Sequence, residues 1–342
     1  MKKEGMGGVT VCIVYYEGID DLRRCLACLK AQSLPPDEIF VVDNSPAGLQ
    51  LEANHPAAPH IIRQGRNLGF AAGNNLAIRE AKTEFVATLN ADAFPEPKWL
   101  ESLVAAAKNH PEAAAFGSLQ LLDEDPMTAD GIGDCYHLSG LAWRSGHKCH
   151  LAELNLSPRT ILSPCGAAAF FRKADFDSVS GFDEDFFCYC EDIDLGFRLW
   201  LAGRACRFVP DAVVRHRGAG STGDSHSDFA VYHGHRNLTW VYIKNMPGIL
   251  FWIFLPLHLI LNLQMVLAVS DRGQGGVIRK AKMDALRQIA AIWGKRLGIQ
   301  ARKKATLLEI WRVLDKSFPP EPWERTIQRN LQLLLRKFMS LK

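Results

Sequence analysis

The chain has 342 residues, of which 48% are hydrophobic and 23% are charged. This composition supports a sizeable core and excludes a wholly disordered chain, a collagen-like repeat and a low-complexity protein. At roughly 100–200 residues per domain, the length fits two domains, or one large α/β domain with an appendage.

The net charge of +3 conceals an uneven distribution along the chain. Residues 270–342 contain 17 Lys and Arg but 6 Asp and Glu, whereas the preceding 269 residues contain 23 basic and 31 acidic residues. An acidic body with a basic tail is not typical of a general nucleic-acid-binding protein, so no nucleic acid is expected as a partner. The pattern favours a soluble domain whose tail meets an anionic surface, of which a membrane face is the commonest.

The nine cysteines are odd in number and irregularly spaced, which indicates reduced cytosolic thiols. Cys25 and Cys28 form a lone CxxC inside a helical apolar pattern, so we interpret them as core; redox or zinc chemistry is the alternative, but no second pair follows. The apolar run at 9–16 is short and ends in acidic residues. It predicts a first strand rather than a signal peptide.

Strands and helices then alternate. Apolar, β-branched runs predict strands at 9–16, 38–43, 60–63, 84–89 and 113–119, and helical periodicity predicts helices at 20–32, 71–82 and 97–109. This alternation predicts an α/β fold with a doubly wound, mostly parallel sheet, in which ligands bind beyond the carboxyl ends of the strands.

The second half of the sequence is less regular. Residues 120–160 are Gly-rich and look like an insertion or an acceptor-side loop. Further on we predict a strand at 161–172, a helix at 191–201, two short strands at 204–209 and 213–216, and a Gly/Ser-rich loop at 216–227.

Residues 249–269 form an uncharged apolar stretch just long enough to span a bilayer. Pro256, His258, Asn262 and Gln264 weaken it as a simple span, and a single crossing would export the basic tail against the positive-inside tendency. We therefore favour an interfacial or re-entrant element, with a buried helical hairpin as the alternative.

Two apolar stripes follow this stretch. They comprise Leu286, Ile289, Ala290, Trp293 and Leu297, and then Ile327, Leu331, Leu334, Phe338 and Leu341. Both predict amphipathic helices that lie on lipid or on a partner helix, with packing against the body as the alternative.

Several strand ends carry polar side chains. Asn90-Ala91-Asp92 closes the strand at 84–89, where Asp92 is suited to bind a hard divalent cation, although Asn-x-Asp is also a common turn. Asp43 closes the second strand, either to accept hydrogen bonds from a ribose or base edge or to form an Asx-turn. His216 follows the last short strand, as a structural histidine or as a second ligand beside Asp92.

Two segments concentrate further candidates. Residues 66–75 place two glycines and three asparagines at the mouth of a helix, which suits close approach of an anion, although this is not a Walker loop. Residues 183–194 hold six carboxylates interleaved with aromatic rings, where a carboxylate can have its pKa raised enough to act as a base. A helix-capping cluster is the alternative.

At this point the ordered motifs resemble those of family 2 glycosyltransferases, and within them the rhamnosyltransferase-like group of bacterial surface polysaccharide synthesis. In chain order they are VTVCIVYY, VVDNS, RNLGFAAGNN, LNADA, PCGAAAFFRK, GFDEDFFCYCEDIDLGFRLWLAG and VVRHRGAGST. The resemblance covers roughly residues 9–237, including a later Tyr…Arg-Asn element at 232–237. It implies a GT-A fold and an inverting transfer of sugar from a nucleotide diphosphate sugar.

The resemblance also implies residue roles. The residues that it places on the nucleotide side are Asp43, Asn67, Gly69, Gly73, Asn74 and Asn90. It makes Asp92 and His216 the ligands of Mg²⁺ or Mn²⁺, and Asp192 the general base, paired with Glu191. On the substrate side it places Asp183, Phe186, Phe187, Tyr189 and Gly166. There are departures from the family pattern. Asn90 replaces a first Asp, Ala91 replaces a commoner Pro, and Tyr16-Glu17 stands where an Asn-Arg-type turn is usual.

From these observations we expect a catalytic domain at 1–240 and a membrane-associating extension at 241–342. The donor implied first is dTDP-rhamnose, followed by UDP-hexoses, and the acceptor a saccharide or lipid-linked saccharide at the cytoplasmic face of the inner membrane. The alternatives are a non-catalytic scaffold of a polysaccharide assembly complex and a sugar nucleotidyltransferase. The latter would need a Gly-rich basic loop after the first strand, which Tyr15-Tyr16-Glu17-Gly18 does not supply.

Overall fold

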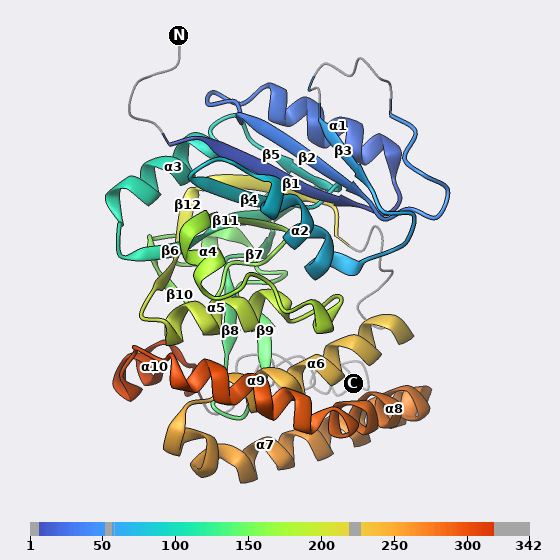
Figure 1. The fold of residues 1–342 in the computed structure, drawn as a ribbon, viewed down its shortest axis with the longest axis vertical. Coiled ribbons are helices and arrows are strands. Elements are labelled where there is room, and N and C mark those ends of the chain that lie inside the picture. The colour runs from blue at the N-terminus through green and yellow to red at the C-terminus, as the bar shows by residue number, and fades with distance from the viewer. Residues whose placement is uncertain (1–6, 52–56, 58, 219–226, 318–342) are drawn as a thin grey trace, which may run out of the picture.

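A ten-stranded mixed sheet forms the centre of the structure, a computed structural model that describes residues 7–51, 57, 59–218 and 227–317 (Figure 1). The strands along its main path follow the order β10-β12-β6-β11-β4-β1-β2-β3. The parallel pairs are β1 with β2 and β4, β2 with β3, and β6 with β12. Strand β11 lies antiparallel between β4 and β6.

The strands have these bounds: β1 (Val9–Tyr15), β2 (Glu38–Asp43), β3 (His60–Arg63), β4 (Phe85–Leu89), β5 (Ala93–Pro95), β6 (Ala113–Leu122), β7 (Ala129–Gly131), β8 (Asp134–Tyr136), β9 (Ala142–Arg144), β10 (Arg159–Ile161), β11 (Ala168–Arg172) and β12 (Ala205–His216). The first five predicted strands are all present. The irregular region 120–160 contains the short strands β7, β8 and β9, of which β8 and β9 form a separate two-stranded sheet.

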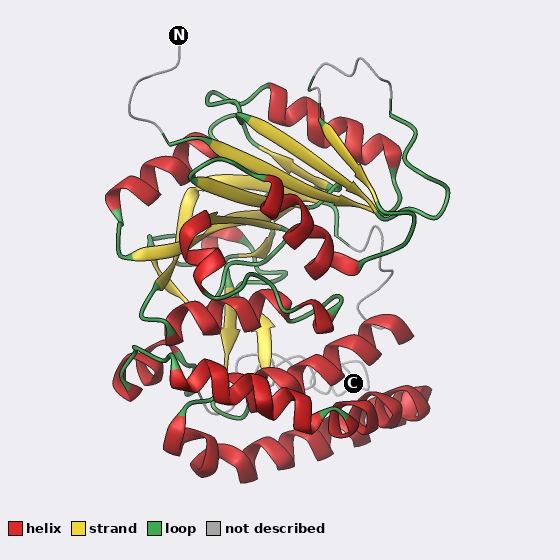
Figure 2. Ribbon diagram, in the orientation of Figure 1, coloured by secondary structure: helices red, strands yellow, loops and turns green. Residues whose placement is uncertain are grey.

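The α-helices are α1 (Ile19–Lys30), α2 (Gly69–Glu80), α3 (Trp99–Asn109), α4 (Lys173–Ser178), α5 (Glu191–Leu201), α6 (Asp228–Asn245), α7 (Gly248–Val269), α8 (Gly275–Arg287), α9 (Ile289–Ala301) and α10 (Leu307–Val313). Helices cover both faces of the sheet (Figure 2). Because side chains alternate along a strand, Val11 and Ile13 of β1 pack in the core with α1 and α3, whereas Cys12 packs in the core with α2 and α5.

The structure corrects two predicted strands. The segment predicted at 161–172 is two strands, because β10 ends at Ile161 and β11 begins at Ala168. Conversely, the strands predicted at 204–209 and 213–216 are the single strand β12, whose register against β6 shifts between Val209 and Val213. An irregularity of this kind breaks the sequence pattern without ending the strand. Cys25 lies fully buried in the core, as predicted.

Helices α6 to α10 form a layer at one end of the molecule (Figure 1). The expected domain boundary at residue 240 lies inside α6. Helices α7 and α8 are joined through Ser270–Gln274, where Gly273 has a non-helical φ of +86° and the chain kinks. Among the described residues, the segment Gly248–Arg287 that contains α7 is the one that is long and apolar enough to cross a membrane. The apolar stripe at 327–341 lies outside the described residues.

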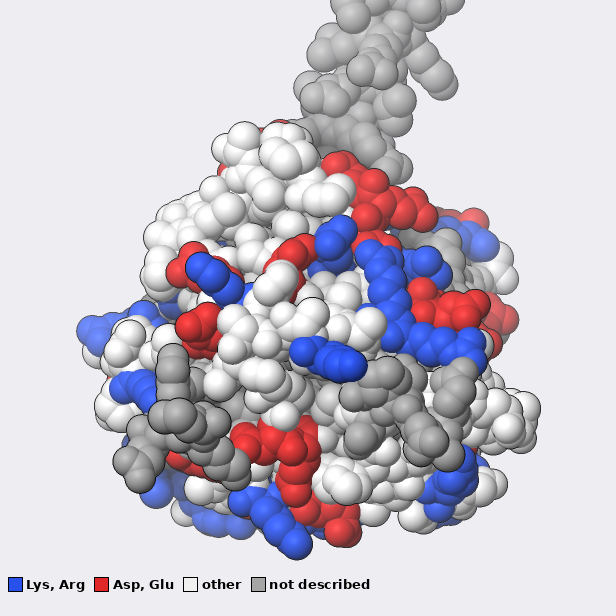
Figure 3. All heavy atoms as spheres, turned by 90° about the horizontal axis from the view of Figure 1, so that it is seen from above, with Lys and Arg blue, Asp and Glu red and all other residues white. Residues whose placement is uncertain are grey.

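The opposite end of the molecule, seen in Figure 3, carries basic and acidic side chains intermixed with uncharged ones. On this face the described Lys and Arg side chains do not merge into one continuous basic surface. The surface charge here is therefore mixed in sign.

Candidate functional site

Strands β4 and β11 bring the predicted metal motif next to the loop that carries Gly166. Leu89, the last residue of β4, pairs with Ala168, the first residue of β11. The backbone N–H of Asn90 donates to the carbonyl of Ala167 at 2.9 Å. The sheet therefore fixes Asn90 beside the loop that precedes β11.

Asp192 stands at the other side of this loop, in the first turn of α5. Its Oδ2 accepts a hydrogen bond of 3.0 Å from the N–H of Gly166, and its Oδ1 accepts one of 2.8 Å from Ile193. Burial raises the pKa of Asp192, although hydrogen bonds from these N–H groups oppose the shift. A partly exposed carboxylate with a raised pKa is suited to take a proton.

Glu191 differs from its neighbour in exposure. Its side chain is 5% exposed, and burial followed by repulsion from Asp192 raises its pKa well above the ordinary value. Its Oε2 has no hydrogen-bond partner among the described residues. Of the predicted catalytic pair, Asp192 is therefore the member that a substrate can reach.

His216, at the end of β12, lies against the metal motif. Its Nε2 is 3.3 Å from Oδ1 of Asp92 and 3.3 Å from Nδ2 of Asn90, and its Nδ1 is 2.8 Å from Oδ2 of Asp130. Burial alone would lower the pKa of His216, but the two carboxylates raise it to about 9. The sequence-predicted pair of Asp92 and His216 is thus brought together.

This donor set fits a divalent cation. A carboxylate and an imidazole face each other, and the second imidazole nitrogen is held by a further carboxylate, as is usual for metal-ligating histidines. Among the described residues, no group of three or more His, Cys, Asp and Glu side chains has the geometry of a metal centre. Protein side chains would therefore supply only part of the coordination shell of such a cation.

Two residues of this site, Asp130 and Arg144, escaped sequence reasoning. They come from the irregular segment that follows β6, where neither periodicity nor a motif distinguishes them. Nη1 of Arg144 is 2.5 Å from Oδ2 of Asp130, and the positive charge of Arg144 also lowers the pKa of Asp192. A chain of polar contacts therefore runs from Asp92 through His216 and Asp130 to Arg144, whose charge acts on Asp192.

The loop before α5 presents a group of rings. Phe187 stacks on His233 with ring centroids 5.3 Å apart, and both rings lie near Phe229, which is 37% exposed. Tyr189 contacts the same Phe229 ring at 6.1 Å. Phe187 and Tyr189 therefore line an open ring cluster, to which Phe229 and His233 of α6 are additions that the sequence did not predict.

This loop has an unusual backbone that α6 holds in place. Phe187, Tyr189 and Cys190 all have positive φ angles, which cost free energy in residues other than glycine. The fully buried amide of Asn237 donates to the carbonyls of Phe186, Cys188 and Tyr189 at 2.7–2.9 Å. The Arg-Asn element therefore supports the loop that ends at Asp192.

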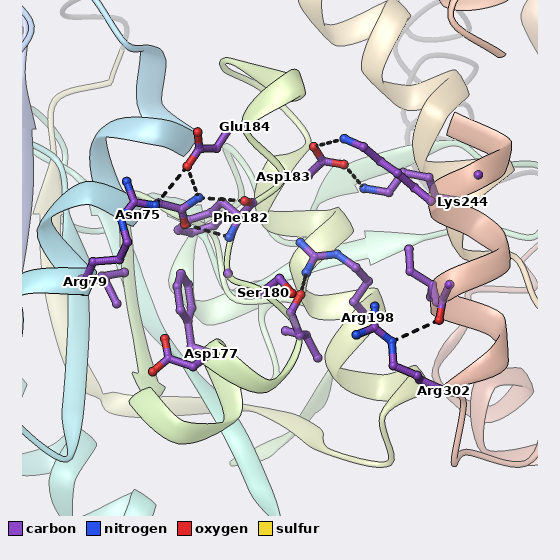
Figure 4. A pocket seen from close by; sticks show the side chains of 18 residues that line it. Asn75, Arg79, Asp177, Ser180, Phe182, Asp183, Glu184, Arg198, Lys244 and Arg302 are labelled. Atoms are coloured by element: carbon purple, nitrogen blue, oxygen red, sulfur yellow. Dashed lines mark hydrogen bonds and ion pairs between the residues drawn. The ribbon is translucent and has the colours of Figure 1, made fainter. Parts of the chain in front are cut away.

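Two predicted substrate-side residues have other roles. Phe186 is fully buried against Trp240, so it is a core residue and does not line a cleft. The carboxylate of Asp183 binds Lys244 and Lys295, and so ties the loop to α6 and α9. Figure 4 shows Asp183 turned toward Lys244 in a pocket of about 550 Å³ that lies between α2, α9 and this loop. Neither Asp92 nor Asp192 lines that pocket.

The predicted nucleotide-side residues surround the start of α2 and the end of β2. Both oxygens of Asp43 accept hydrogen bonds from its own loop, from Ser45 and Leu49, which is the Asx-turn alternative. Oδ1 of Asn67 accepts from the N–H of Gly69 at 2.8 Å, in a turn directly before α2, whose N-cap residue is Leu68. Their roles toward a nucleotide stay predictions.

Gly69, Gly73 and Asn74 of α2 also make close contacts within the protein. At Gly69, whose φ is +77°, a Cβ would lie 2.5 Å from the carbonyl oxygen of Phe187, and at Gly73 one would lie 2.8 Å from Val14. Asn74 is 1% exposed and donates to the carbonyl of Phe70 at 3.0 Å. These contacts bring α2 close to both β1 and the ring-bearing loop.

Solved structures with the same fold are glycosyltransferases. Mannosyltransferase PcManGT from Pyrobaculum calidifontis, in complex with GDP-Man and Mn²⁺, superimposes with a TM-score of 0.51 at 17% identity, covering 91% of this chain and 84% of that one. GalNAc-T7 with UDP, GalNAc and Mn²⁺ gives a TM-score of 0.56 at 17% identity, covering 71% of this chain and 48% of that one. The fold defined by the sheet and its helices is that of the GT-A class.

Sequence comparisons place the chain within this class. Residues 10–179 match Glycosyl transferase family 2. N-acetylglucosaminyl-diphospho-decaprenol L-rhamnosyltransferase of Mycobacterium tuberculosis (strain H37Rv) is 29% identical over 248 residues, 65% of this chain and 80% of its own length. Rhamnosyltransferase WbbL of Escherichia coli (strain K12) is 27% identical over 223 residues, 59% and 80% respectively. The chain carries a family 2 glycosyltransferase domain of the GT-A fold, similar to rhamnosyltransferases.

Proposed function

We propose that the protein is an inverting, divalent-metal-dependent glycosyltransferase. It moves a sugar from a nucleotide diphosphate sugar to a saccharide or lipid-linked saccharide in bacterial cell-surface polysaccharide synthesis. Rhamnose is the first choice for this sugar. The rhamnosyltransferase relatives support the choice of sugar and acceptor class. The Mn²⁺ in both glycosyltransferase structures of the same fold supports the cation.

The observation that carries the proposal is the common edge shared by Asp92 and Asp192. The loop 165–167 joins the two sites, since it binds Asn90 through a backbone hydrogen bond and Asp192 through Gly166. A cation site and a base on one edge of the sheet are what a displacement at a sugar carbon needs. Mg²⁺ or Mn²⁺ held by Asp92 and His216 would neutralise charge on the departing diphosphate.

In this reaction Asp192 takes the proton of the acceptor hydroxyl. The hydroxyl oxygen forms a new bond to C1 of the sugar while the bond from C1 to the diphosphate oxygen breaks, and its electron pair leaves with the nucleoside diphosphate. A single displacement inverts the configuration at C1. Phe187, Tyr189 and Phe229 would stack against the acceptor.

The experiment compares wild type with Asp192→Asn and with Asp177→Asn, a control on the surface of α4. First, a thermal-shift panel of nucleoside diphosphates with Mn²⁺ identifies the nucleotide, because a bound ligand stabilises the folded state. Turnover is then measured with the matching sugar donor. We expect Asp192→Asn to lose about 10²–10⁴-fold in kcat with the nucleotide shift preserved. Near wild-type turnover of Asp192→Asn would show that Asp192 is not the base. If wild type neither binds a nucleotide of the panel nor turns over a donor, a scaffold role is favoured.

Helix α7 supports a membrane partner because its outward face is apolar as well as its buried one, which comprises Leu250, Phe251, Leu261 and Val269 together with one histidine. Toward the protein it presents His258, which is 3% exposed, stacks on Tyr242 at 3.9 Å and lies 2.8 Å from the carbonyl oxygen of Ser139. Toward the outside it presents large apolar side chains that are 54–60% exposed, namely Ile249, Trp252, Ile253, Leu259, Ile260, Leu263 and Leu267.

We propose that this outward face lies on the cytoplasmic surface of the inner membrane. Contiguous exposed apolar surface of this kind marks an interaction site, and the basic residues of the tail suit anionic lipid. A single crossing would strip His258 from Ser139 and Tyr242, and Asn262 from Thr239, because these three partners lie outside α7. The geometry therefore favours a peripheral or monotopic helix, which would place a lipid-linked acceptor near the ring cluster.

A further inference from the structure

The acidic side chain of Asp130 is the most heavily engaged carboxylate of the described site that the proposed reaction does not use. It is 3% exposed and lies on β7, which pairs with the end of β6. Strand β12, which ends at His216, flanks the same end of β6 from the other side. One strand thus holds both residues in register with each other.

The contact between them selects the tautomer that His216 adopts when it is neutral. Oδ2 of Asp130 lies 2.8 Å from Nδ1 of His216, and an ionised carboxylate at that distance can only accept a hydrogen bond. The proton of a neutral imidazole is then on Nδ1, and the lone pair is on Nε2. Nε2 is the nitrogen that faces Asp92 and Asn90.

Asp130 is in turn fixed by its own hairpin. Nη1 of Arg144 lies 2.5 Å from Oδ2 of Asp130, and Nδ1 of His147 lies 3.2 Å from Oδ1. The side chain of Arg144 reaches Asp130 across Gly131, where an added Cβ would lie 2.3 Å from its Cδ. Backbone hydrogen bonds between Ala129 and the 148–149 segment, each 2.8 Å, close the hairpin.

We infer that Asp130 is a positioning residue for His216, held in place by Arg144, and that it sets the affinity of the site for its divalent cation. The inference rests on the proposed function, because it takes Asp92 and His216 as the cation ligands. Carboxylates that orient a ligating histidine typically change metal affinity by about 10–100-fold when removed. The irregular segment 120–160 therefore contributes to the cation site as well as to the surface beside it.

The test measures binding of Mn²⁺ itself, by electron paramagnetic resonance of the free ion, in the presence of dTDP or UDP, whichever stabilises the protein more. Wild type is compared with Asp130→Ala, His216→Ala, the double variant, and Asp125→Asn as a control on the exposed β6–β7 turn. We expect Asp130→Ala to weaken Mn²⁺ binding about 10–100-fold. In the His216→Ala background the same change should have less than about a twofold effect, because Asp130 then has no imidazole to orient.

The outcomes separate the inference from the proposed function. The cation site itself would be ruled out if wild-type protein did not bind Mn²⁺, or if His216→Ala bound Mn²⁺ as tightly as wild type does. The positioning role alone is overturned if His216→Ala loses Mn²⁺ binding while the affinity of Asp130→Ala stays within about twofold of wild type. It is also overturned if Asp130→Ala lowers Mn²⁺ affinity equally in the wild-type and His216→Ala backgrounds. Should Asp130→Ala not fold, the isosteric Asp130→Asn decides by the same criteria, with its folding checked by circular dichroism.

Discussion

The N–H of Gly166 donates a hydrogen bond of 3.0 Å to Oδ2 of Asp192, and so joins the loop before β11 to the start of α5. Residues 166 and 192 belong to different elements, and the bond between them aligns the proposed base with the edge of the sheet that carries Asp92. A Cβ at residue 166 would make an ordinary contact of 3.6 Å with that oxygen, but it would lie 2.9 Å from Cζ of Phe70, which is too close.

Gly166→Ala is expected to lower kcat/KM at least about tenfold. The new methyl group would lie 2.9 Å from Cζ of Phe70, so either that ring or the loop whose Gly166 N–H binds Asp192 must move. Steady-state kinetics with donor and acceptor measures the effect. Gly234→Ala in α6, where nothing lies within 4 Å of the added Cβ, is the matched control and should keep wild-type rates. Equal kinetics for the two variants would show that the loop tolerates a methyl group at residue 166 without moving Asp192.

Asn237→Ala is expected to destabilise the protein by about 1–3 kcal/mol and to reduce turnover. The substitution removes the donor from the carbonyls of Phe186, Cys188 and Tyr189, and the left-handed backbone of this loop then loses its support. Urea unfolding and kcat are measured together. Asn155→Ala, in an exposed turn, serves as the control. Unchanged turnover in Asn237→Ala would show that the loop keeps its shape without the amide.

The stability of wild type relative to Lys282→Met is expected to rise between pH 7 and pH 10. Burial lowers the pKa of Lys282 to about 7, and its Nζ donates to the carbonyl of His235 and to Thr239. The ordinary pKa of lysine is about 10.4, so in this range the unfolded chain binds more protons than the folded one, and stability increases with pH. Below pH 7 both states are charged and the difference is flat.

Urea midpoints of both proteins at pH 7, 8.5 and 9.5 measure this linkage. Comparing wild type with the variant cancels the other titrating groups. Lys280→Met, at an exposed position of the same helix, should show a pH dependence like that of wild type. If the difference in stability between wild type and Lys282→Met is constant over this pH range, the amine of Lys282 stays charged in the folded protein.

Replacing the outward residues of α7 should release the protein from membranes. In the triple variant Trp252→Ser, Leu259→Ser and Leu263→Ser, three side chains that are 59–60% exposed lose their apolar surface, while the inward His258 contacts remain. Sedimentation with vesicles containing anionic lipid is the measurement. Wild type is expected in the pellet and the triple variant in the supernatant, with Met127→Ser on the body as the control. A triple variant that pellets as wild type does would contradict the lipid contact.

Local sequence patterns were sufficient for the elements and for part of the site. Buried runs and polar strand ends predicted β4 followed by Asn90 and Asp92, because a parallel strand buried on both faces reads as an uninterrupted apolar run. The Glu-Asp pair was placed correctly in the first turn of α5. The sequence pattern also identified the apolar stretch at 249–269, which is unbroken by charge and forms α7 in the structure.

Tertiary structure alone decided which of these residues meet. The pairing of His216 with Asp130 joins residues 86 positions apart through their shared neighbour β6, and no local pattern encodes that distance. Phe186 looked like an open ring because aromatic residues serve both cores and binding surfaces, and its burial follows from the placement of Trp240 on α6. The inward direction of His258 was likewise set by contacts with the body of the protein, because periodicity gives the faces of a helix but not the neighbour that each face meets.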